Sequence, residues 1–407
     1  MDIKPIYSAL MRNKAGLALI VLQVAITLAV VCNSLFIIVE RSELVARPSG
    51  MDEPNTFRLA SLGFVRDYDL KSAVRQDLDL IRSLPGVVAA TLTNSIPTSN
   101  GGWGTGVDTE PLERGTGKEA HGAGMYFADE QAIEAFGLKL VEGRNFRAEE
   151  ITDSVSESGL LFDSVIVSEA LAKKIAPEGS AVGKVVYGIS DDTTPKTVIG
   201  VVERLQMPWT GSGEVEQSVL VPTRNLGDNF SMYVVRTEPG QRDAVMKEVE
   251  TRLQAANPGR IIRGVRTVES VRADAYRDDH AMMSILFGVM AAMLMVTGAG
   301  IVGLASFWVT RRTKQIGTRR ALGARRFNIK AYFQTENGIM VGMGIVLGGL
   351  MAYGFNAWLM SEYDAARLPW YYVPVGALVV FFLGQLAVWG PASRAAKVSP
   401  AVATRTA

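Results

Sequence analysis

The sequence predicts a membrane protein with four transmembrane α-helices, one plus three, and a large two-lobed mixed α/β extracytoplasmic domain. Three observations predict this fold class. Four long windows contain no charged residue, and about 240 residues separate the first window from the second. Basic residues gather beside the windows, whereas acidic residues gather in the long intervening segment. Together these features divide the chain into a membrane part and a water-exposed part.

The four windows are long enough to cross a bilayer. Each contains 25 to 30 residues without Asp, Glu, Lys, Arg or His. About 20 apolar residues span the hydrocarbon core as a helix, and a soluble helix of this length would need a polar face. The windows are Ala15–Val39, Ala281–Thr310, Asn337–Ser361 and Leu368–Ser393.

The first window is predicted to be an uncleaved anchor. Lys4, Arg12 and Lys14 precede it, as basic residues precede the apolar region of a signal peptide. The apolar run is longer than the ~7–15 residues of a signal peptide, however, and no A-x-A cleavage site follows it.

Basic residues beside the windows predict the orientation. Eight Arg or Lys residues and a single acid, Glu336, lie between the second and third windows. By the positive-inside rule, both termini and segment 311–336 are cytoplasmic. Residues 40–280 then hold 27 basic and 37 acidic residues, a net charge of −10. Such an acidic domain argues against nucleic-acid binding.

The predicted domains follow from these boundaries. The only cysteine, Cys32, lies in the first window, so the outer domain must be held together by its core rather than by disulfides within the chain. The domains are 1–39, the cytoplasmic N-terminus and first transmembrane helix; 40–280, the extracytoplasmic core domain; 281–393, three transmembrane helices with the cytoplasmic coupling loop 311–336; and 394–407, the cytoplasmic tail.

Helix and strand patterns alternate along the outer domain, which predicts an α/β or α+β fold. The predicted strands are Ser164–Val167, Val185–Gly188, Thr197–Val202, Ser218–Val221 and Met232–Arg236. The predicted helices are Leu70–Leu84, Asp129–Phe136, Glu169–Ile175 and Gln241–Ala256, and Ser168 is expected to cap the third. Residues Pro97–Gly106 are predicted to form a surface loop with one packed Trp; contact with a partner or ligand is the alternative.

No motif for enzymatic chemistry is found, so we predict no catalytic, cofactor-binding or metal-binding residue. The strings at Gly117-Lys118 and Gly179–Lys184 lack the spacing of a phosphate-binding loop. The two histidines, His121 and His280, are too few and too isolated for a zinc site. The cluster Asp278-Asp279-His280 is interpreted as a cap at the start of the second span.

The spans themselves lack the intramembrane charges that ion pathways often use. Their sparse polar residues are expected to form hydrogen bonds between helices. The third span also carries small residues four apart, which predicts close helix packing within the chain or in a dimer. These residues are Gly338, Gly342, Gly344 and Gly348.

One segment combines charge with a particular order. Residues 311–324 read RRTKQIGTRRALGA, with five Arg or Lys residues and two glycines directly after the second window. A topology signal that contacts anionic lipid would explain the charge. It would not explain the apolar positions Ile316, Leu322, Phe327 and Ile329. A helix that leaves the bilayer, turns and returns would form a protruding elbow suited to the groove of a cytoplasmic partner.

The sequence resembles the permease subunits of MacB/FtsX-type ABC transporters over nearly its whole length. KQIGTRRALGARRFNIKAYF is similar to the family's loop R-x-x-E-I-G-x-R-R-A-[LM]-G-A with its following helix. Further similar stretches are MYFADEQAIEAFGLKLVEGRNF (Met125–Phe146), VIVSEALAKKIAPEGSAVGK (Val165–Lys184), Thr197–Val202 and GPASRAAKVSPAVAT (Gly390–Thr404).

The resemblance implies mechanotransmission: ATPase subunits dimerise on ATP, and long helices then move the outer domain. The elbow would be the coupling element, with the C-terminal segment 394–400 assisting. The residues implied in ATPase coupling are Arg311, Arg312, Lys314, Gln315, Ile316, Gly317, Arg319, Arg320, Ala321, Leu322, Gly323 and Arg325. Gln315 stands where the family has Glu and lacks its charge.

The resemblance also implies the partners and the location. The chain would lie in the bacterial inner membrane with its large domain in the periplasm. It carries no cofactor of its own, and ATP and Mg would bind to a separate cytoplasmic ABC ATPase subunit. The other implied partners are the lipid bilayer, a second permease copy or paralogue, a periplasmic adaptor protein and an outer-membrane duct.

Export or efflux of a drug, peptide or toxin is the function that we expect. An FtsX-like regulator of cell-wall hydrolases is one alternative, but such proteins usually have a smaller outer domain. A lipoprotein-releasing permease is another. A membrane-anchored binding or sensor protein without an ATPase is the third, and the pattern of the elbow argues against it. The sequence does not identify the substrate.

Overall fold

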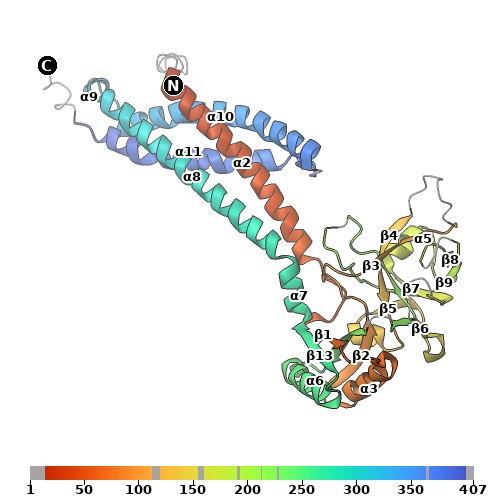
Figure 1. Cartoon of the computed structure of the whole chain (residues 1–407). Helices are drawn as coiled ribbons and strands as arrows, with labels where there is room; N and C mark the ends of the chain where they lie inside the picture. The colour runs from red at the N-terminus through yellow and green to blue at the C-terminus, as the bar shows by residue number, and fades with distance from the viewer. Residues whose placement is uncertain are drawn as a thin grey trace. The chain divides into compact units, whose positions relative to one another are not determined.

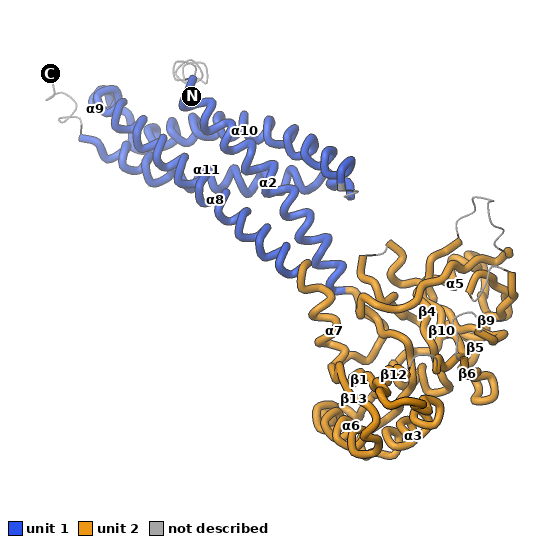
Figure 2. The backbone as a smooth tube through the Cα atoms, viewed as in Figure 1, with its two compact units in different colours: residues 1–46, 279–407 blue, residues 47–278 orange. Residues whose placement is uncertain are grey.

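The structure, a computed structural model, describes residues 14–111, 120–154, 160–189, 193–211, 213–226, 229–363 and 366–399. The chain forms two compact units (Figure 2). The membrane unit comprises residues 1–46 and 279–407, and the outer unit comprises residues 47–278.

Four helices of the described chain are long and apolar enough to cross a membrane, as the sequence predicts (Figure 1). The first three extend beyond their uncharged windows at both ends, whereas the fourth begins inside its window and extends past it only at the C-terminal end. They are α2 (Lys14–Ala46), α8 (Arg277–Arg311), α10 (Arg326–Tyr363) and α11 (Tyr372–Ala396), and the short α9 (Thr313–Ala321) joins α8 to α10.

Glycines bring α10 close to α2. A Cβ atom built on Gly344 would lie 2.6 Å from the Cβ of Val24, and one on Gly348 would lie 2.8 Å from the carbonyl oxygen of Ala25. Any side chain there would clash, and in the second case the clash would be with backbone. Apolar solvent cannot drive helices together by the hydrophobic effect, so this close backbone contact is what stabilises the pair in a bilayer.

Polar side chains of the spans link neighbouring helices, which is the role that the sequence predicts for them. They replace water as hydrogen-bond partners inside the bundle. The contacts are Gln23 Nε2 to the Val296 oxygen at 2.9 Å, Thr27 to Thr297 at 2.7 Å between hydroxyls, and Asn33 Nδ2 to the Ala352 oxygen at 3.1 Å.

The first lobe of the outer unit is a four-stranded antiparallel sheet in the order β13-β1-β12-β2. Two helices pack their apolar faces against it around the buried Phe57, Leu59 and Tyr233. The elements are β1 (Thr56–Gly63), β2 (Val87–Thr93), β12 (Phe230–Thr237), β13 (Arg260–Thr267), α3 (Leu70–Ser83) and α6 (Arg242–Ala256), preceded by η1 (Glu53–Asn55).

The second lobe is a mixed seven-stranded sheet in the order β3-β4-β10-β7-β9-β5, with β8 paired to β9. A small parallel pair, β11 with β6, accompanies it. The strands are β3 (Trp103–Val107), β4 (His121–Phe127), β5 (Leu140–Gly143), β6 (Thr152–Ser154), β7 (Ser164–Ser168), β8 (Val185–Val186), β9 (Lys196–Val202), β10 (Ser218–Val221) and β11 (Thr223–Asn225). The remaining elements are α4 (Ala132–Phe136), α5 (Glu169–Ile175), α7 (Val268–Ala275) and η2 (Ala148–Glu150).

The sequence located α5 and its cap correctly. The Ser168 hydroxyl accepts a hydrogen bond from the backbone N–H of Leu171. The prediction of a loop over Pro97–Gly106 is wrong in its second half, because Trp103 begins β3, which pairs with β4. Trp103 is packed edge-to-face against Phe127, with ring centroids 5.0 Å apart.

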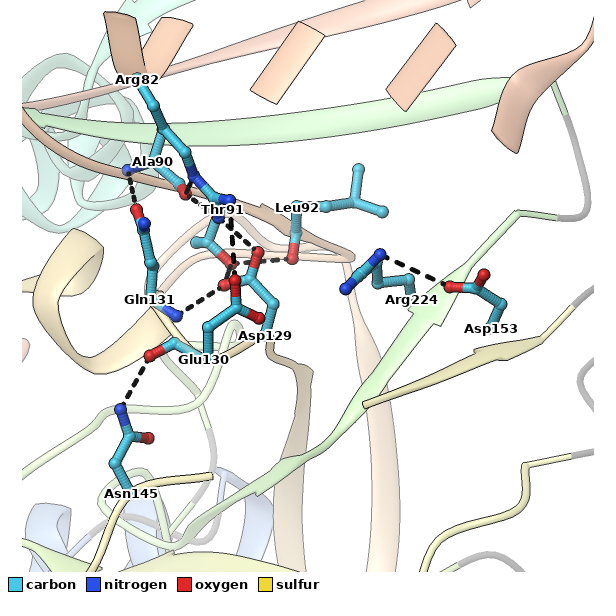
Figure 3. Close-up of polar contacts among 10 residues, drawn as sticks. All are labelled: Arg82, Ala90, Thr91, Leu92, Asp129, Glu130, Gln131, Asn145, Asp153 and Arg224. Atoms are coloured by element: carbon cyan, nitrogen blue, oxygen red, sulfur yellow. Dashed lines mark hydrogen bonds and ion pairs between the residues drawn. The ribbon is translucent and has the colours of Figure 1, made fainter. Parts of the chain in front are cut away.

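A buried polar network joins the two lobes (Figure 3). Arg82 of α3 donates to the carboxylate of Asp129, just after β4, at 2.8 Å, and also to the carbonyl oxygen of Ala90. The Thr91 hydroxyl and the backbone N–H of Gln131 donate to the same carboxylate at 2.8 and 3.0 Å. Burial nevertheless raises the pKa of Asp129, because desolvation of the charged form outweighs its attraction to Arg82.

Candidate coupling site at the elbow

The elbow is the turn formed by residues 311–326, from the end of α8 through α9 to the start of α10. The Arg312 N–H still bonds to the Trp308 oxygen at 3.0 Å, so α9 continues from α8 with little interruption. α9 ends at Ala321, and Gly323 follows with a φ of +95°, in the left-handed region that glycine adopts most easily. The N–H groups of Gly323 and Ala324 bond back to carbonyl oxygens of α9 and close the turn.

The inner face of the elbow is apolar and packed. Ile316 is buried with Ile329 and Phe333 of α10 and with Ala392 and Ala395 near the end of α11. This cluster fixes α9 against two of the spanning helices. The base of the elbow is therefore held in place by side-chain packing.

An ion pair ties the same base together. Arg312 Nη1 lies 2.9 and 3.0 Å from the two carboxylate oxygens of Glu336, which is almost fully buried. The Arg312 guanidinium also lies 5.8 Å from the ring centroid of Trp308, and that of Arg319 lies 4.9 Å from the ring of Tyr332. The electrostatic attraction of cations to aromatic faces adds to the ion pair.

The residues predicted to couple to an ATPase fall into two groups. Ile316 and Gly317 are buried, so they shape the elbow from within, and Arg312 and Arg320 are partly buried. The remaining eight are exposed, and Phe327 is exposed beside them. The exposed group is Arg311, Lys314, Gln315, Arg319, Ala321, Leu322, Gly323 and Arg325.

The end of α11 lies against the elbow. Arg320 donates a hydrogen bond to the backbone oxygen of Val398, and Val398 also packs beside the inner apolar cluster. Of segment 394–400, the structure describes residues 394–399, and Pro400 lies outside the described residues.

The four predicted packing glycines face different surroundings. Gly344 and Gly348 meet α2, as described above. A Cβ on Gly338 would lie 3.3 Å from Nε2 of Gln385 on α11, whereas one on Gly342 would have no described atom within 4 Å. Gly342 therefore faces open space in this chain.

Sequence reasoning missed Glu336, Trp308 and Asn337, which lie behind the elbow. One signal was present, because Glu336 is the single acid among eight basic residues. If this carboxylate is buried, it needs one of those basic residues as an ion-pair partner. In the part of the chain that the structure describes, no three His, Cys, Asp or Glu side chains gather as a metal site. Asp279, in the first turn of α8, pairs with Arg41 at 3.2 Å.

Two protein-family models match this chain. Residues 19–252 match the sequence model of the MacB-like periplasmic core domain, and residues 287–400 match that of the FtsX-like permease C-terminal domain. The chain belongs to the MacB/FtsX-type family of ABC transporter permeases. Its spanning helices and outer unit are therefore those of a MacB/FtsX-type permease.

The MacB/FtsX-type chain is similar to several named relatives. It is 28% identical over 279 residues to the macrolide export ATP-binding/permease protein MacB of Hahella chejuensis, which covers 67% of this chain and 41% of the relative. It is 24% identical over 295 residues to the uncharacterized ABC transporter permease YvrN of Bacillus subtilis, covering 69% of each chain. The chain thus spans about two fifths of the length of that MacB relative.

Two solved structures resemble the MacB/FtsX-type chain. The extracellular domain of YknZ from Gram-positive bacteria covers 52% of this chain and all of its own, with 17% identity and a TM-score of 0.32. The periplasmic region of MacB from Actinobacillus actinomycetemcomitans covers 55% of this chain and 94% of its own, with 17% identity and a TM-score of 0.31.

Proposed function

We propose that this permease couples ATP hydrolysis by a separate ATPase subunit to movements of its outer unit, and that the elbow is the coupling element. The observation that carries the proposal is the contrast between the two faces of the elbow. The inner face is fixed by an apolar cluster and by the Arg312–Glu336 pair. The outer face presents exposed arginines and the side chain of Leu322, which is 83% exposed.

The exposed face has the chemistry of a docking surface. Leu322 and Phe327 offer apolar contact, and Arg319 and Arg325 offer charge-assisted hydrogen bonds to acidic or backbone groups of a partner. Gln315 keeps hydrogen-bonding capacity at the position where the family has Glu. Movement imposed on this face passes to α8 and α10 through the fixed base, and α8 leads directly from the outer unit along the chain.

The proposal includes an orientation and a substrate class. The elbow and both termini face the cytoplasm, where ATP is available, and the outer unit faces the periplasm. The substrate is a drug, peptide or toxin for export, with a periplasmic adaptor and an outer-membrane duct as further partners. A second permease copy or paralogue completes the transporter.

The first test is co-purification of the tagged chain with an ATPase from its native membranes, with ATP hydrolysis measured on the eluate. Leu322→Asp should remove the co-purifying ATPase, because it places a charge on the docking face without entering the packed base. Leu161→Asp is the matched control, since Leu161 is 76% exposed but lies in the outer unit. Recovery of the stable chain without any ATPase, in all three forms, would contradict the proposal.

Orientation is tested separately with introduced cysteines. Cys32 is buried, so a cysteine placed at Leu322 or Leu161 provides the reactive thiol. In intact cells, a membrane-impermeant maleimide should label the Leu161→Cys protein and should label Leu322→Cys only after the inner membrane is opened. The reverse pattern would place the elbow outside the cytoplasm.

A further inference from the structure

A small cavity lies within the membrane unit, directly behind the elbow. Its wall includes Ile20 of α2, Trp308 of α8 and Phe333, Asn337 and Met340 of α10. The volume open to the centre of a water molecule is about 10 Å³. This is roughly the smallest space that holds one water molecule and is far too small for an organic ligand.

Trp308 contributes a hydrogen-bond donor to this wall. Its indole Nε1–H is buried and has no hydrogen-bond acceptor within reach among the described residues. The indole nitrogen can only donate. Buried N–H groups are nearly always paired, with protein or with ordered water, because an unpaired one has lost its hydration.

Asn337 contributes an acceptor to the same wall. Its Nδ2 donates to the carbonyl oxygen of Gly384 at 3.0 Å, whereas its Oδ1 is buried and has no donor in the described part of the chain. Turning the amide over would set its oxygen against the Gly384 oxygen, two acceptors face to face. The hydrogen bond to Gly384 therefore fixes Oδ1 as the atom that needs a donor.

The third polar group on the wall is Glu336. Arg312 binds both of its carboxylate oxygens, yet each oxygen can accept a further hydrogen bond. The residues that line this cavity thus carry a donor-only indole, an amide oxygen that needs a donor, and a carboxylate. The occupant must both donate and accept. The neighbouring Glu336 and Arg312 carry opposite charges, so they favour neither an anion nor a cation.

We infer that this cavity is a binding site for one structural water molecule that bridges α8 and α10. The water accepts a hydrogen bond from Trp308 Nε1 and donates one to Asn337 Oδ1, and its second hydrogen is directed to the Glu336 carboxylate. Three partners are the usual number for a buried water. The water thus gives a hydrogen-bond partner to Trp308 Nε1 and to Asn337 Oδ1, which have none among the described residues.

The position of the bridge gives it a consequence for movement, which rests on the proposed function. A direct hydrogen bond breaks when two helices separate by more than a few tenths of an ångström. A bridging water can turn and shift while it keeps both helices paired. When the elbow is displaced, the water site thus lets the distance between α8 and α10 change slightly beside the Arg312–Glu336 pair.

The test is X-ray radiolytic footprinting of the full chain in detergent or nanodiscs, without an ATPase. Radicals formed from a bound water modify the side chains around it, even where bulk solvent has no access. Met340 is 3% exposed and lines the cavity, and Met246, partly exposed on α6 of the outer unit, serves as the dose reference. We expect Met340 to be oxidised at a rate comparable with that of Met246.

Two variants locate the source of the radicals. Asn337→Leu removes the acceptor and fills the cavity. Trp308→Phe removes the donor, and the space that its smaller ring adds is lined by apolar groups and does not itself bind water. Each should lower the oxidation of Met340 several-fold and leave that of Met246 unchanged. Trp389→Phe, the same replacement on an exposed side chain of α11, should change neither rate.

Unmodified Met340 in the native protein would overturn the inference. So would a Met340 rate that neither variant changes, because the radicals would then come from bulk solvent. If Asn337→Leu fails to fold, the native rate and Trp308→Phe still decide. The footprint requires no ATPase, so its outcome is independent of whether the proposed coupling is correct.

Discussion

Two arginine–carboxylate pairs, one in each unit, have nearly the same burial. In the outer unit, Arg82 is 23% exposed and Asp129 is 1% exposed, with 2.8 Å between their charged atoms. At the elbow, Arg312 is 22% exposed and Glu336 is 1% exposed, with 2.9 Å between them. Burial and distance alone would assign both pairs the same role.

Their surroundings differ. Thr91 and a backbone N–H also donate to the Asp129 carboxylate, and Arg82 donates to the Ala90 oxygen. Glu130 lies beside them, and its Oε2 has no partner among the described residues. At the elbow, the neighbouring Trp308 and Asn337 each keep one polar atom unpaired by the described protein. The Asp129 carboxylate is held by donors from three residues, whereas among the described residues Arg312 is the one that donates to Glu336. The first pair fixes a contact between the two lobes, and the second fixes the elbow against α10.

The largest expected effect is in the outer unit. Asp129→Ala leaves the Arg82 guanidinium buried without its carboxylate, and should destabilise the outer unit by about 3–5 kcal/mol. Thermal or denaturant unfolding of the full chain in detergent would measure this. Asp153→Ala is the control, because Asp153 pairs with Lys71 and Arg224 at a partly exposed position and should cost less than about 1 kcal/mol. Equal effects of the two variants would remove the contrast between buried and exposed pairs.

The elbow pair should respond differently. Glu336→Gln keeps a hydrogen-bond acceptor for Arg312 but removes the charge, and should cost only about 1.5–3 kcal/mol of stability. Coupling should be weakened as well: the rate of ATP hydrolysis that depends on the permease should fall roughly tenfold, equivalent to ~1.4 kcal/mol. Unfolding and ATPase assays on the same preparation would separate the two effects. Full coupling in Glu336→Gln would show that the pair is only structural.

Helix packing gives a smaller effect within the membrane unit. Gly348→Ala places a methyl group 2.8 Å from a backbone oxygen of α2, so the helices must separate, at a cost of about 1–3 kcal/mol. Gly342→Ala meets no described atom within 4 Å and should be nearly neutral in the monomer. Melting temperatures in detergent would compare them. A large loss in Gly342→Ala at high protein concentration only would indicate a helix from a second copy.

The smallest effect concerns pH. Arg144 binds the Glu150 carboxylate through two nitrogens, which lowers the pKa of Glu150 from 4.5 to about 2. A folded pKa below the unfolded value stabilises the folded state above pH 4.5, and this contribution is lost as the pH falls from 4.5 through 2. Glu150→Gln should therefore cost about 1 kcal/mol at neutral pH, since the pair is partly exposed, and almost nothing near the lower limit.

The buried Asp129 changes the stability with pH in the opposite direction. Its raised pKa means that its contribution to stability increases as the pH falls through that pKa. The difference between the native protein and Glu150→Gln isolates Glu150, because Asp129 is common to both. A difference that stays constant from neutral pH down to 2 would show that Glu150 is not held in its charged form.

Much of the fold could be predicted because its signals are local. Uncharged windows, charge asymmetry and the pattern of the elbow each occupy one continuous stretch, and helices such as α5 carry their own cap at Ser168. Strands were harder to locate. The described strands that were not predicted are β1, β2, β3, β4, β5, β6, β11 and β13. Two of them, β1 and β13, are stabilised by pairing with strands far away in the chain.

The sequence by itself determined the four spanning helices, the mixed outer domain and the family, since hydropathy and motif order need no knowledge of contacts. Only the tertiary structure decided which residues of the elbow face inward, that Arg312 meets Glu336, and that Trp308 and Asn337 share a cavity. Trp308 and Asn337 lie on different helices, α8 and α10. Their proximity depends on how side chains fill the space between helices, and no periodicity in the sequence records that packing.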